Sequence, residues 1–215
     1  MKFSVLLCCY GDFPEYSLRA INSIVNNNRI FDLHVGCNDC GQKTISIFRK
    51  MQDEHKIDTL IESNQNLNRD QMMRLLIERT QTEYVLWMDD DSHVLQGWDS
   101  AIDQFIDENK PFDGAGQLFV AGRYPEYKDL SKLRPWWKHG YDESKDVYFP
   151  IGGLFMFRAD FMRKYNFPDR GMIRNYGDMF FGDLIVQQKG TLKLFNEQIM
   201  SKIKINDGNR RGINK

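Results

Sequence analysis

The chain has 215 residues, of which 41% are hydrophobic and 27% charged, as in an ordinary soluble globular protein. Its 29 Lys and Arg nearly balance its 30 Asp and Glu, so the net charge of −1 does not by itself call for nucleic acid or an anionic membrane. No apolar run approaches the ~20 residues that span a bilayer, and the short run after Lys2 lacks the cleavage site of a signal peptide. We therefore expect a single cytoplasmic domain with no membrane partner.

The four cysteines all lie in the first fifth of the chain, at positions 8, 9, 37 and 40. A disulfide framework would be spread more widely, so reduced thiols are expected. Cys37 and Cys40 form a C-x-x-C pair, but a structural zinc site needs a second well-spaced pair, which adjacent Cys8 and Cys9 do not provide.

The first half of the chain alternates apolar runs with segments of helical periodicity. Residues 3–9 form a continuous apolar run, which is typical of a parallel strand covered on both faces. Leu18, Ile21 and Ile24 follow at helical spacing. The same alternation predicts strands at 31–37, 57–61 and 84–88, and helices around 45–51, 72–79 and 98–106. This order predicts right-handed βαβ units around a parallel sheet.

The second half has a different character. Residues 119–148 are rich in Gly, Pro, aromatic and charged residues and have little periodicity, so we interpret them as a long functional loop. A strand at 149–158 contains Gly152 and Gly153, and a helix is expected at 178–189, ended by Gly190. Short strands are predicted at 191–195 and 200–205.

Polar residues stand where the predicted parallel strands end. Tyr10 and Asp12 follow the first strand, Asp39 follows the second, and Asp89, Asp90 and Asp91 follow the fourth. Ligands bind at the carboxyl ends of strands in open parallel sheets, so these positions are expected to share one site.

The acid triplet is the most informative of these features. In extended backbone successive side chains alternate, so Asp89 and Asp91 would point one way and Asp90 the other. Two hard oxygen ligands on one side suit Mg²⁺ or Mn²⁺, which take one or two carboxylates and fill the remaining positions with water and phosphate oxygens. The alternative is an acidic turn or helix N-terminus, since Asp favours both.

These residues resemble the family 2 glycosyltransferases of GT-A fold over about residues 3–205. Residues 3–10 resemble the first strand of that family, residues 35–39 the second, and residues 84–91 its D-x-D strand. The stretch 64–67 with Arg74 is similar to an "N-x-G…A-R-N" motif, in which Asn68 replaces the Gly and Leu75 the last Asn. Residues 152–158 resemble the acceptor-side "G-G-x-x-x-x-R" segment.

The resemblance implies an α/β chain of GT-A fold: a Rossmann-like, mostly parallel sheet flanked by helices, with a smaller mixed acceptor-side part. One domain, 1–215, would comprise a nucleotide-sugar-binding half at 1–110 and an acceptor-side half with the C-terminal tail at 111–215. The donor would be a nucleotide-diphosphate sugar, with UDP favoured, bound with Mn²⁺ or Mg²⁺. Expected donor contacts are Tyr10, Asp39, Arg74, Asp89 and Asp90. In the family, the Asp at the position of Asp39 usually holds the nucleoside.

The metal is expected on Asp91, with Asp89 shared between the metal shell and the ribose. The tail lies where many relatives carry a metal-binding His, so Asn206 or Asp207 would replace it, and Asp207 is the ligand chosen here. Arg210 and Arg211 could close over the diphosphate, because guanidinium forks match phosphate oxygens. The alternative for these two is a solvated basic terminus.

The family's catalytic base is the second acid of an E-D pair before a helix, and the equivalent position here is Asp178, preceded by Gly177. Asp183 is the second candidate. A carboxylate that takes the proton of the acceptor hydroxyl is typically worth ~10²–10⁴-fold in rate. A single base opposite the leaving group implies in-line attack with inversion. The alternative for Asp178 is a helix N-cap.

The acceptor is expected to contact Trp136, Trp137, His139, Gly152 and Gly153. Aromatic faces suit stacking on sugars or bases, and basic residues of the loop and tail could form a rim for a polyanion. Residues 87–91, 168–169 and 188–190 together with the Arg-Arg-Gly tail resemble a subgroup found in phage and bacterial genomes, which would place the enzyme in the host cytoplasm. A hydroxymethylated pyrimidine in DNA is therefore one candidate acceptor, beside glycans, proteins and lipid-linked sugars. A non-catalytic nucleotide-sugar or nucleic-acid binding module and a nucleotidyltransferase are the rival classes.

Overall fold

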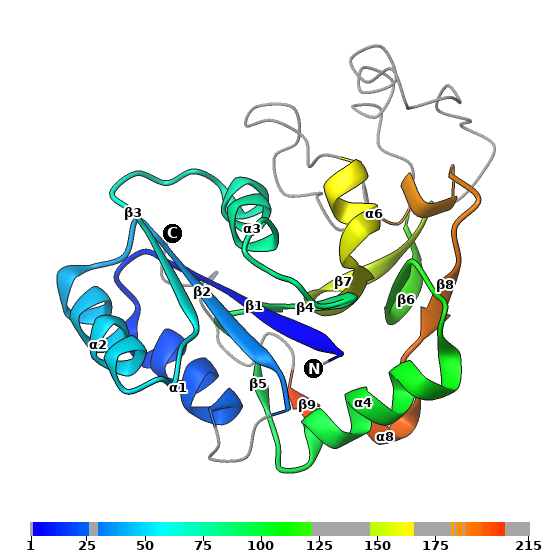
Figure 1. Cartoon of the computed structure of the whole chain (residues 1–215), viewed down its shortest axis with the longest axis horizontal. Helices are drawn as coiled ribbons and strands as arrows, with labels where there is room; N and C mark the ends of the chain where they lie inside the picture. The colour runs from blue at the N-terminus through cyan, green and yellow to red at the C-terminus, as the bar shows by residue number, and fades with distance from the viewer. Residues whose placement is uncertain are drawn as a thin grey trace.

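A seven-stranded sheet forms the centre of the computed structural model, which describes residues 2–25, 30–121, 147–165, 182, 184–186 and 188–204 (Figure 1). The strand order is β3-β2-β1-β4-β7-β6-β8. The strands are β1 (Phe3–Tyr10), β2 (Asp32–Asn38), β3 (Thr59–Ser63), β4 (Tyr84–Asp89), β6 (Gly114–Ala121), β7 (Val147–Arg158) and β8 (Leu192–Leu194).

The first four strands are parallel and form the βαβ units predicted from the sequence. Between them run the helices α1 (Pro14–Ile24), α2 (Gln42–Asp53) and α3 (Arg69–Ile77). Pro14 begins α1, where its missing N–H costs nothing. Gly36 of β2 lets α3 approach the sheet closely, because a Cβ there would overlap the side chain of Met72.

The remaining strands make the sheet mixed. β7 is antiparallel to both β4 and β6, and β8 is parallel to β6. The predicted loop at 119–148 is wrong at both ends, because residues 119–121 continue β6 and residues 147–148 begin β7. Sequence patterning also missed the start of β6, where Gly114 and Gly116 weaken the strand signal. It further missed β5 (His93–Val94), α6 (Ala159–Lys164) and α8 (Glu197–Met200).

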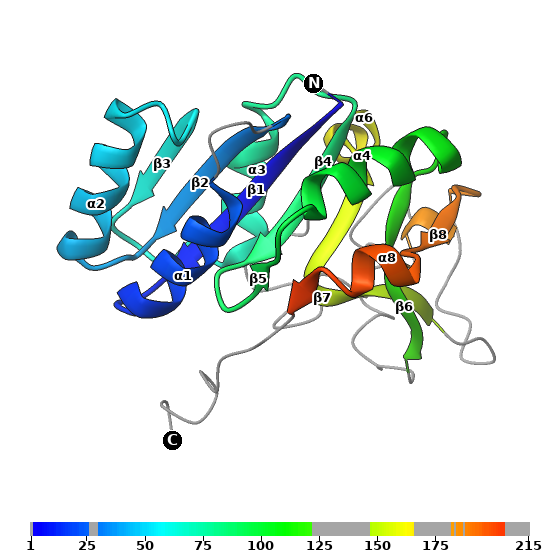
Figure 2. The same ribbon diagram turned by 90° about the horizontal axis from the view of Figure 1, so that it is seen from below.

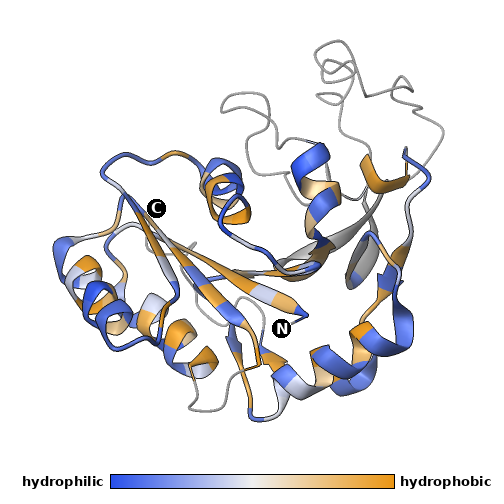
Figure 3. Ribbon diagram, in the orientation of Figure 1, coloured by the Kyte–Doolittle hydropathy of each residue, from blue (hydrophilic) through white to orange (hydrophobic). Residues whose placement is uncertain are grey.

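Helices cover both faces of the sheet. α1, α2, α4 (Trp98–Asn109) and α8 lie on one face, and α3 and α6 lie on the other (Figures 1 and 2). A small second sheet pairs β5 with β9 (Ile203–Lys204) beside α1 and α8. The helices carry alternating polar and apolar stripes, as an amphipathic covering layer requires (Figure 3).

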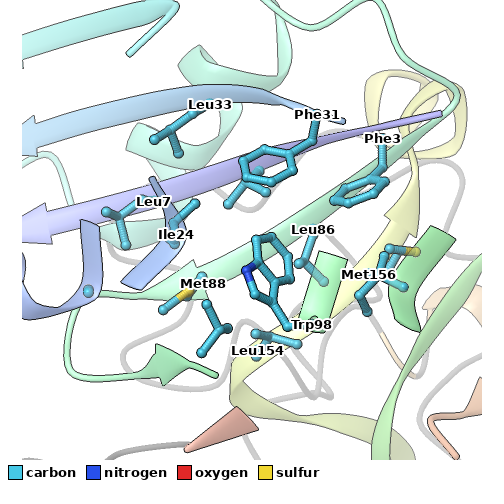
Figure 4. Close-up of a cluster of buried hydrophobic side chains, with 14 of the residues drawn as sticks. Phe3, Leu7, Ile24, Phe31, Leu33, Leu86, Met88, Trp98, Leu154 and Met156 are labelled. Carbon is cyan, nitrogen blue, oxygen red and sulfur yellow. The ribbon is translucent and has the colours of Figure 1, made fainter. Parts of the chain in front are cut away.

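The core is accordingly divided by the sheet into two clusters. Phe3 and Leu7 of β1 face α1 and α4, where Phe3 and Phe31 stack at 5.6 Å between ring centroids and Phe31 lies 5.0 Å from Trp98 (Figure 4). Leu6, on the other face of β1, packs with the cluster beneath α3 and α6. Burial on both faces explains why these strands are continuously apolar rather than alternating.

The four cysteines are free thiols and all are buried. Cys9 of β1 and Cys37 of β2 stand opposite each other in the strand register and belong to the same core cluster, while Cys8 belongs to the cluster on the other face of the sheet. Burial raises the pKa of Cys8 and Cys9 well above the ordinary thiol value, and the Asp90 carboxylate raises it further. These thiols therefore stay protonated at neutral pH.

Among the described residues, no helix combines the length and the apolar character that crossing a membrane would need.

Candidate active site

The carboxyl ends of β1, β2, β3 and β4 meet at one edge of the sheet, called the carboxyl edge below. Tyr10 pairs with Asn38, and Asn38 pairs with Ser63. Asp89, the last residue of β4, pairs with Cys8 of β1. The structure thus brings Tyr10, Asp39 and the acid triplet together, as the strand-end argument predicted.

The β6–β7 pair continues past this edge. Leu154 pairs with Met88, so Gly152 and Gly153 stand beside the end of β4, and Gly153 has a left-handed backbone (φ 108°) that favours glycine. β6 ends at Ala121 and β7 begins at Val147 beyond the last pair of β4. The other end of the resembling segment, Arg158, lies at the opposite edge, where it pairs with Tyr84.

The acid triplet occupies a strand end and a turn. Asp89 closes β4, and its carbonyl accepts a hydrogen bond from the N–H of Ser92 at 3.0 Å, so Asp90 and Asp91 are the two central residues of a turn. The predicted alternation of three acids along extended backbone is therefore wrong. Asp is common in turns. The alternative interpretation of the triplet, an acidic turn, therefore describes the backbone correctly.

Asp90 is buried and ties three elements together. Its Oδ2 accepts hydrogen bonds from the hydroxyl of Ser17 on α1 at 2.8 Å and from the N–H of Tyr10 at 3.2 Å. A buried carboxylate needs such partners, because an unpaired charge there would be costly. Asp90 therefore has a role in the fold, and its expected contact with the donor stays a prediction.

Asp89 contacts two residues on the α3 side of the sheet. The indole Nε1–H of Trp87 donates to Asp89 Oδ1 at 3.0 Å, and a guanidinium nitrogen of Arg69 lies 3.7 Å from Oδ2. The same guanidinium lies over the Trp87 ring, 4.9 Å from its centroid. Sequence reasoning missed Arg69, because nothing in a linear pattern shows that the first residue of α3 turns toward β4.

An asparagine network holds the loop between β3 and α3 at the carboxyl edge. Asn38 Oδ1 accepts from the N–H of Leu67 at 2.8 Å, and its amide donates to Asn66 Oδ1 at 3.3 Å. Asn66 Oδ1 also accepts from the N–H of Asn68 at 2.9 Å. Asn68 has φ 75° and ψ 150°, a backbone conformation that glycine adopts far more easily than Asn, so the position suits the glycine of the motif and Asn68 is strained there.

Asp39 and Arg74 are two further predicted donor contacts. Asp39 is exposed, has φ 62°, and its N–H donates to the carbonyl of Ser63 at 2.9 Å. Arg74 is half-buried on α3, five residues after Arg69. At 100° per residue these two arginines project from different sides of the helix.

Several predicted site residues lie outside the described residues: Trp136, Trp137, His139, Asp178, Asp183, Asp207, Arg210 and Arg211. Of the predicted helix at 178–189, the described residues Gly182 and Leu184–Val186 are helical, with Leu184 and Ile185 in the core. The N–H of Gly190 donates to the carbonyl of Ile185 at 2.8 Å, where this helix ends.

The divalent cation predicted at the carboxyl edge would need ligands in addition to the described acids. Within the described ranges, no group of three or more His, Cys, Asp or Glu is arranged to enclose a metal. Asp91 is half-buried in the turn after β4, and its assignment to the cation stays a prediction of the sequence. One carboxylate together with phosphate oxygens is an ordinary environment for Mg²⁺ or Mn²⁺.

Comparison with known proteins agrees with this geometry. The sequence profile described as "Glycosyl transferase family 2" matches residues 4–166, more than half of the chain. The chain belongs to glycosyl transferase family 2. This places it among enzymes that transfer glycosyl groups, and the predicted family and fold class are confirmed.

Solved structures share the fold of this family 2 chain at low sequence identity. TarS of S. aureus (residues 1–349) superposes with a TM-score of 0.64 at 16% identity, covering 92% of this chain and 58% of TarS; a TarS complex with UDP gives 0.64 at 17% identity over the same shares. A mannosyltransferase from Pyrobaculum calidifontis, in complex with GDP-Man and Mn²⁺, gives 0.65 at 13% identity over 92% of this chain and 55% of its own. The chain thus spans little more than half of these chains, and 35% of a further TarS structure that it matches with a TM-score of 0.64. Among curated protein sequences, none matches it significantly.

Proposed function

We propose that this family 2 glycosyltransferase moves a sugar from a nucleotide-diphosphate donor, UDP-sugar being favoured, to an acceptor hydroxyl with inversion and with help from a divalent cation. The observation that supports this most is the carboxyl edge, where the acid-bearing end of β4 stands beside the Tyr10 end of β1 and the Asn38–Asp39 end of β2. Ligands of open parallel sheets bind at such an edge.

Each donor group has a proposed partner at this edge. Tyr10, 39% exposed, and Asp39 would hold the nucleoside, and Asp89 would accept from the ribose hydroxyls. Asp91 and Asp207 would hold the cation. TarS structures with UDP and UDP-GlcNAc and the mannosyltransferase structure with GDP-Man and Mn²⁺ support this class of ligand.

The departing diphosphate carries negative charge, and the cation, when bound, supplies Lewis-acid stabilisation of that charge. The chain's own arginines would add to this: Arg74 from α3, and Arg210 and Arg211 from the tail, whose guanidinium forks match phosphate oxygens. Asp178, or Asp183 in its place, would take the proton of the acceptor hydroxyl during in-line attack.

The acceptor proposed for the first test is a hydroxymethylated pyrimidine in DNA. It is supported by the basic and aromatic residues of the sequence on either side of β7, among them Trp136, Trp137, His139, Arg210 and Arg211. Aromatic side chains can stack an extruded base, and basic side chains can neutralise phosphates. Glycan, protein and lipid-linked acceptors are the alternatives, with contacts at Gly152 and Gly153 in every case.

One assay series tests donor and acceptor together. The purified chain is incubated with radiolabelled UDP-sugars, with Mn²⁺ or with EDTA, and with DNA containing hydroxymethylcytosine, hydroxymethyluracil or neither. Mn²⁺-dependent incorporation into modified DNA alone would support the full proposal. Mn²⁺-dependent hydrolysis of the donor without incorporation into DNA would keep the donor site and redirect the acceptor to saccharides.

The rival classes give other results. A non-catalytic binding module would bind UDP and release no labelled sugar under any condition. A nucleotidyltransferase would form nucleotide-diphosphate sugar from a nucleoside triphosphate and a sugar phosphate rather than consume it. Either result would contradict the proposed reaction.

A further inference from the structure

Three side chains from two elements form a connected group on the α3 side of the carboxyl edge. Asp89 ends β4, Trp87 stands two residues earlier on the same face of that strand, and Arg69 begins α3. The Trp87 Nε1–H donates to Asp89 Oδ1 at 3.0 Å. The Arg69 guanidinium lies 3.7 Å from Asp89 Oδ2 and 4.9 Å from the centroid of the Trp87 ring.

Each member of this group is itself held in place. Trp87 is buried, and its ring packs against Phe155 of β7 at 4.7 Å between centroids. Arg69 is held over the indole, and its Nε also lies 3.4 Å from Asp70, whose side chain is buried. A planar guanidinium stacked on an aromatic ring loses little freedom when it meets a carboxylate. The Asp89 carboxylate is therefore held by a hydrogen bond at Oδ1 and by a longer ion pair at Oδ2.

We propose that Arg69 and Trp87 form a clamp that holds the Asp89 carboxylate in the orientation that accepts the ribose hydroxyls of the donor nucleotide. Arg69 and Trp87 are positioning residues that act through Asp89. The clamp rests on the proposed function, because it presupposes a nucleotide at the carboxyl edge.

Lone-pair capacity and charge favour a ribose over a cation as the partner of Asp89. An ionised carboxylate offers about four acceptor positions, so it can receive ribose O–H donors while it keeps Trp87 and Arg69. A second cation placed on the same carboxylate would meet the positive charge of Arg69. The clamp thus separates the acids by task, with Asp89 for the ribose and Asp91 for the cation.

Binding of UDP, 2′-deoxy-UDP and 3′-deoxy-UDP by calorimetry with Mn²⁺ tests the clamp. The unmodified chain should bind UDP about tenfold or more tightly than at least one deoxy nucleotide, as expected for a lost hydrogen bond to a charged acceptor. Arg69→Gln should weaken UDP binding and bring that ratio to within about threefold of one, because the carboxylate is no longer oriented. Arg69→Lys keeps the charge without the planar fork and should fall between them.

Trp87→Phe keeps an aromatic ring beneath Arg69 but removes the N–H donor, so it should also lower the ratio. Arg49→Gln is the matched control: it removes an arginine that pairs with Glu62 at 2.6 Å on the surface, and it should leave the ratio unchanged. Melting curves and circular dichroism show whether each variant is folded, and Arg69→Gln replaces a partly exposed side chain.

The outcomes of these measurements distinguish a failure of the clamp from a failure of the proposed function. If Arg69→Gln weakens all three nucleotides equally, the residue is merely structural and the clamp is overturned. If Asp89→Asn loses the discrimination and Arg69→Gln keeps it, Asp89 binds the ribose without the clamp. If Asp89→Asn keeps the discrimination, the ribose lies elsewhere and the clamp is wrong while a donor site stands. If the unmodified chain binds neither UDP nor GDP, the proposed function fails together with the clamp.

Discussion

The charged residues at the two edges of the central sheet are arranged differently. At the amino edge, where β1 and β4 begin, acids and bases pair with each other: Arg158 meets Asp113 at 3.1 Å and Asp160 at 2.7 Å, and Lys2 meets Asp103 at 2.9 Å. At the carboxyl edge three successive acids stand together, and within the described ranges Arg69 is the cation that an ion pair ties to them.

Under the proposed function, the paired charges of the amino edge serve the fold, whereas the acids of the carboxyl edge serve both the fold and the ligand. Paired charges at the amino edge satisfy one another and leave little for a ligand to gain. An acid-rich edge raises its own electrostatic energy, which a bound cation lowers. The polar groups of the carboxyl edge also fix loops, through Asp90 on Ser17 and Asn38 on Leu67, so the site is shaped before a ligand arrives.

If the chemistry is confined to the carboxyl edge, no variant at the amino edge should slow sugar transfer as much as a variant of the proposed base. Asp178→Asn should bind UDP normally and transfer sugar at least about 100-fold more slowly, the lower end expected for a general base. Single-turnover transfer with labelled donor measures this. A slow Asp183→Asn beside an unaffected Asp178→Asn would move the base to Asp183.

The next largest effect is on stability, at the buried acid of the carboxyl edge. Asp90→Ala should lower the free energy of unfolding by about 2 kcal/mol, because the Ser17 hydroxyl and the Tyr10 N–H lose their acceptor. Asp90→Asn keeps an acceptor oxygen and should lose less. Urea unfolding followed by circular dichroism measures both, and an Asp90→Ala variant as stable as the unmodified chain would show that Asp90 does not hold the turn.

A smaller effect is expected at the amino edge. Asp113 accepts from the N–H of Thr191 at 2.9 Å and pairs with Arg158, so Asp113→Ala should cost about 1 kcal/mol of stability. Its UDP affinity with Mn²⁺ should equal that of the unmodified chain. A clear loss of UDP binding in this variant would break the division between the two edges.

The first half of the fold could be predicted from sequence because its parallel strands lie between two layers of helices. A continuous apolar run such as residues 84–88, with helical segments before and after it, is typical of a strand buried on both faces. The second half was harder: β6 contains Gly114 and Gly116 and is paired with β7 through a register shift between Gly116 and Leu118, so its pattern is broken.

The candidate site, too, could be predicted from sequence only in part. Strand ends are set by topology, so Tyr10, Asp39 and Asp89 could be placed at one edge from sequence. The turn at Asp90–Asp91 depends on a hydrogen bond between Ser92 and Asp89, and the contact of Arg69 depends on how α3 is rotated over β4. Neither is a property of residue spacing. The assigned roles of Asp178, Asp183, Asp207, Arg210 and Arg211 stay predictions.

The central claim is that the turn after β4 presents Asp91 to a cation bound with the donor's diphosphate. Titration of the unmodified chain with UDP should raise its melting temperature in Mn²⁺ and much less in EDTA, because a ligand that binds only the folded state stabilises it. Asp91→Asn should keep the fold and lose the Mn²⁺-dependent part of this rise, while Asp113→Asn should retain it. An Asp91→Asn variant that binds UDP with unchanged affinity in the presence of Mn²⁺ would contradict the claim.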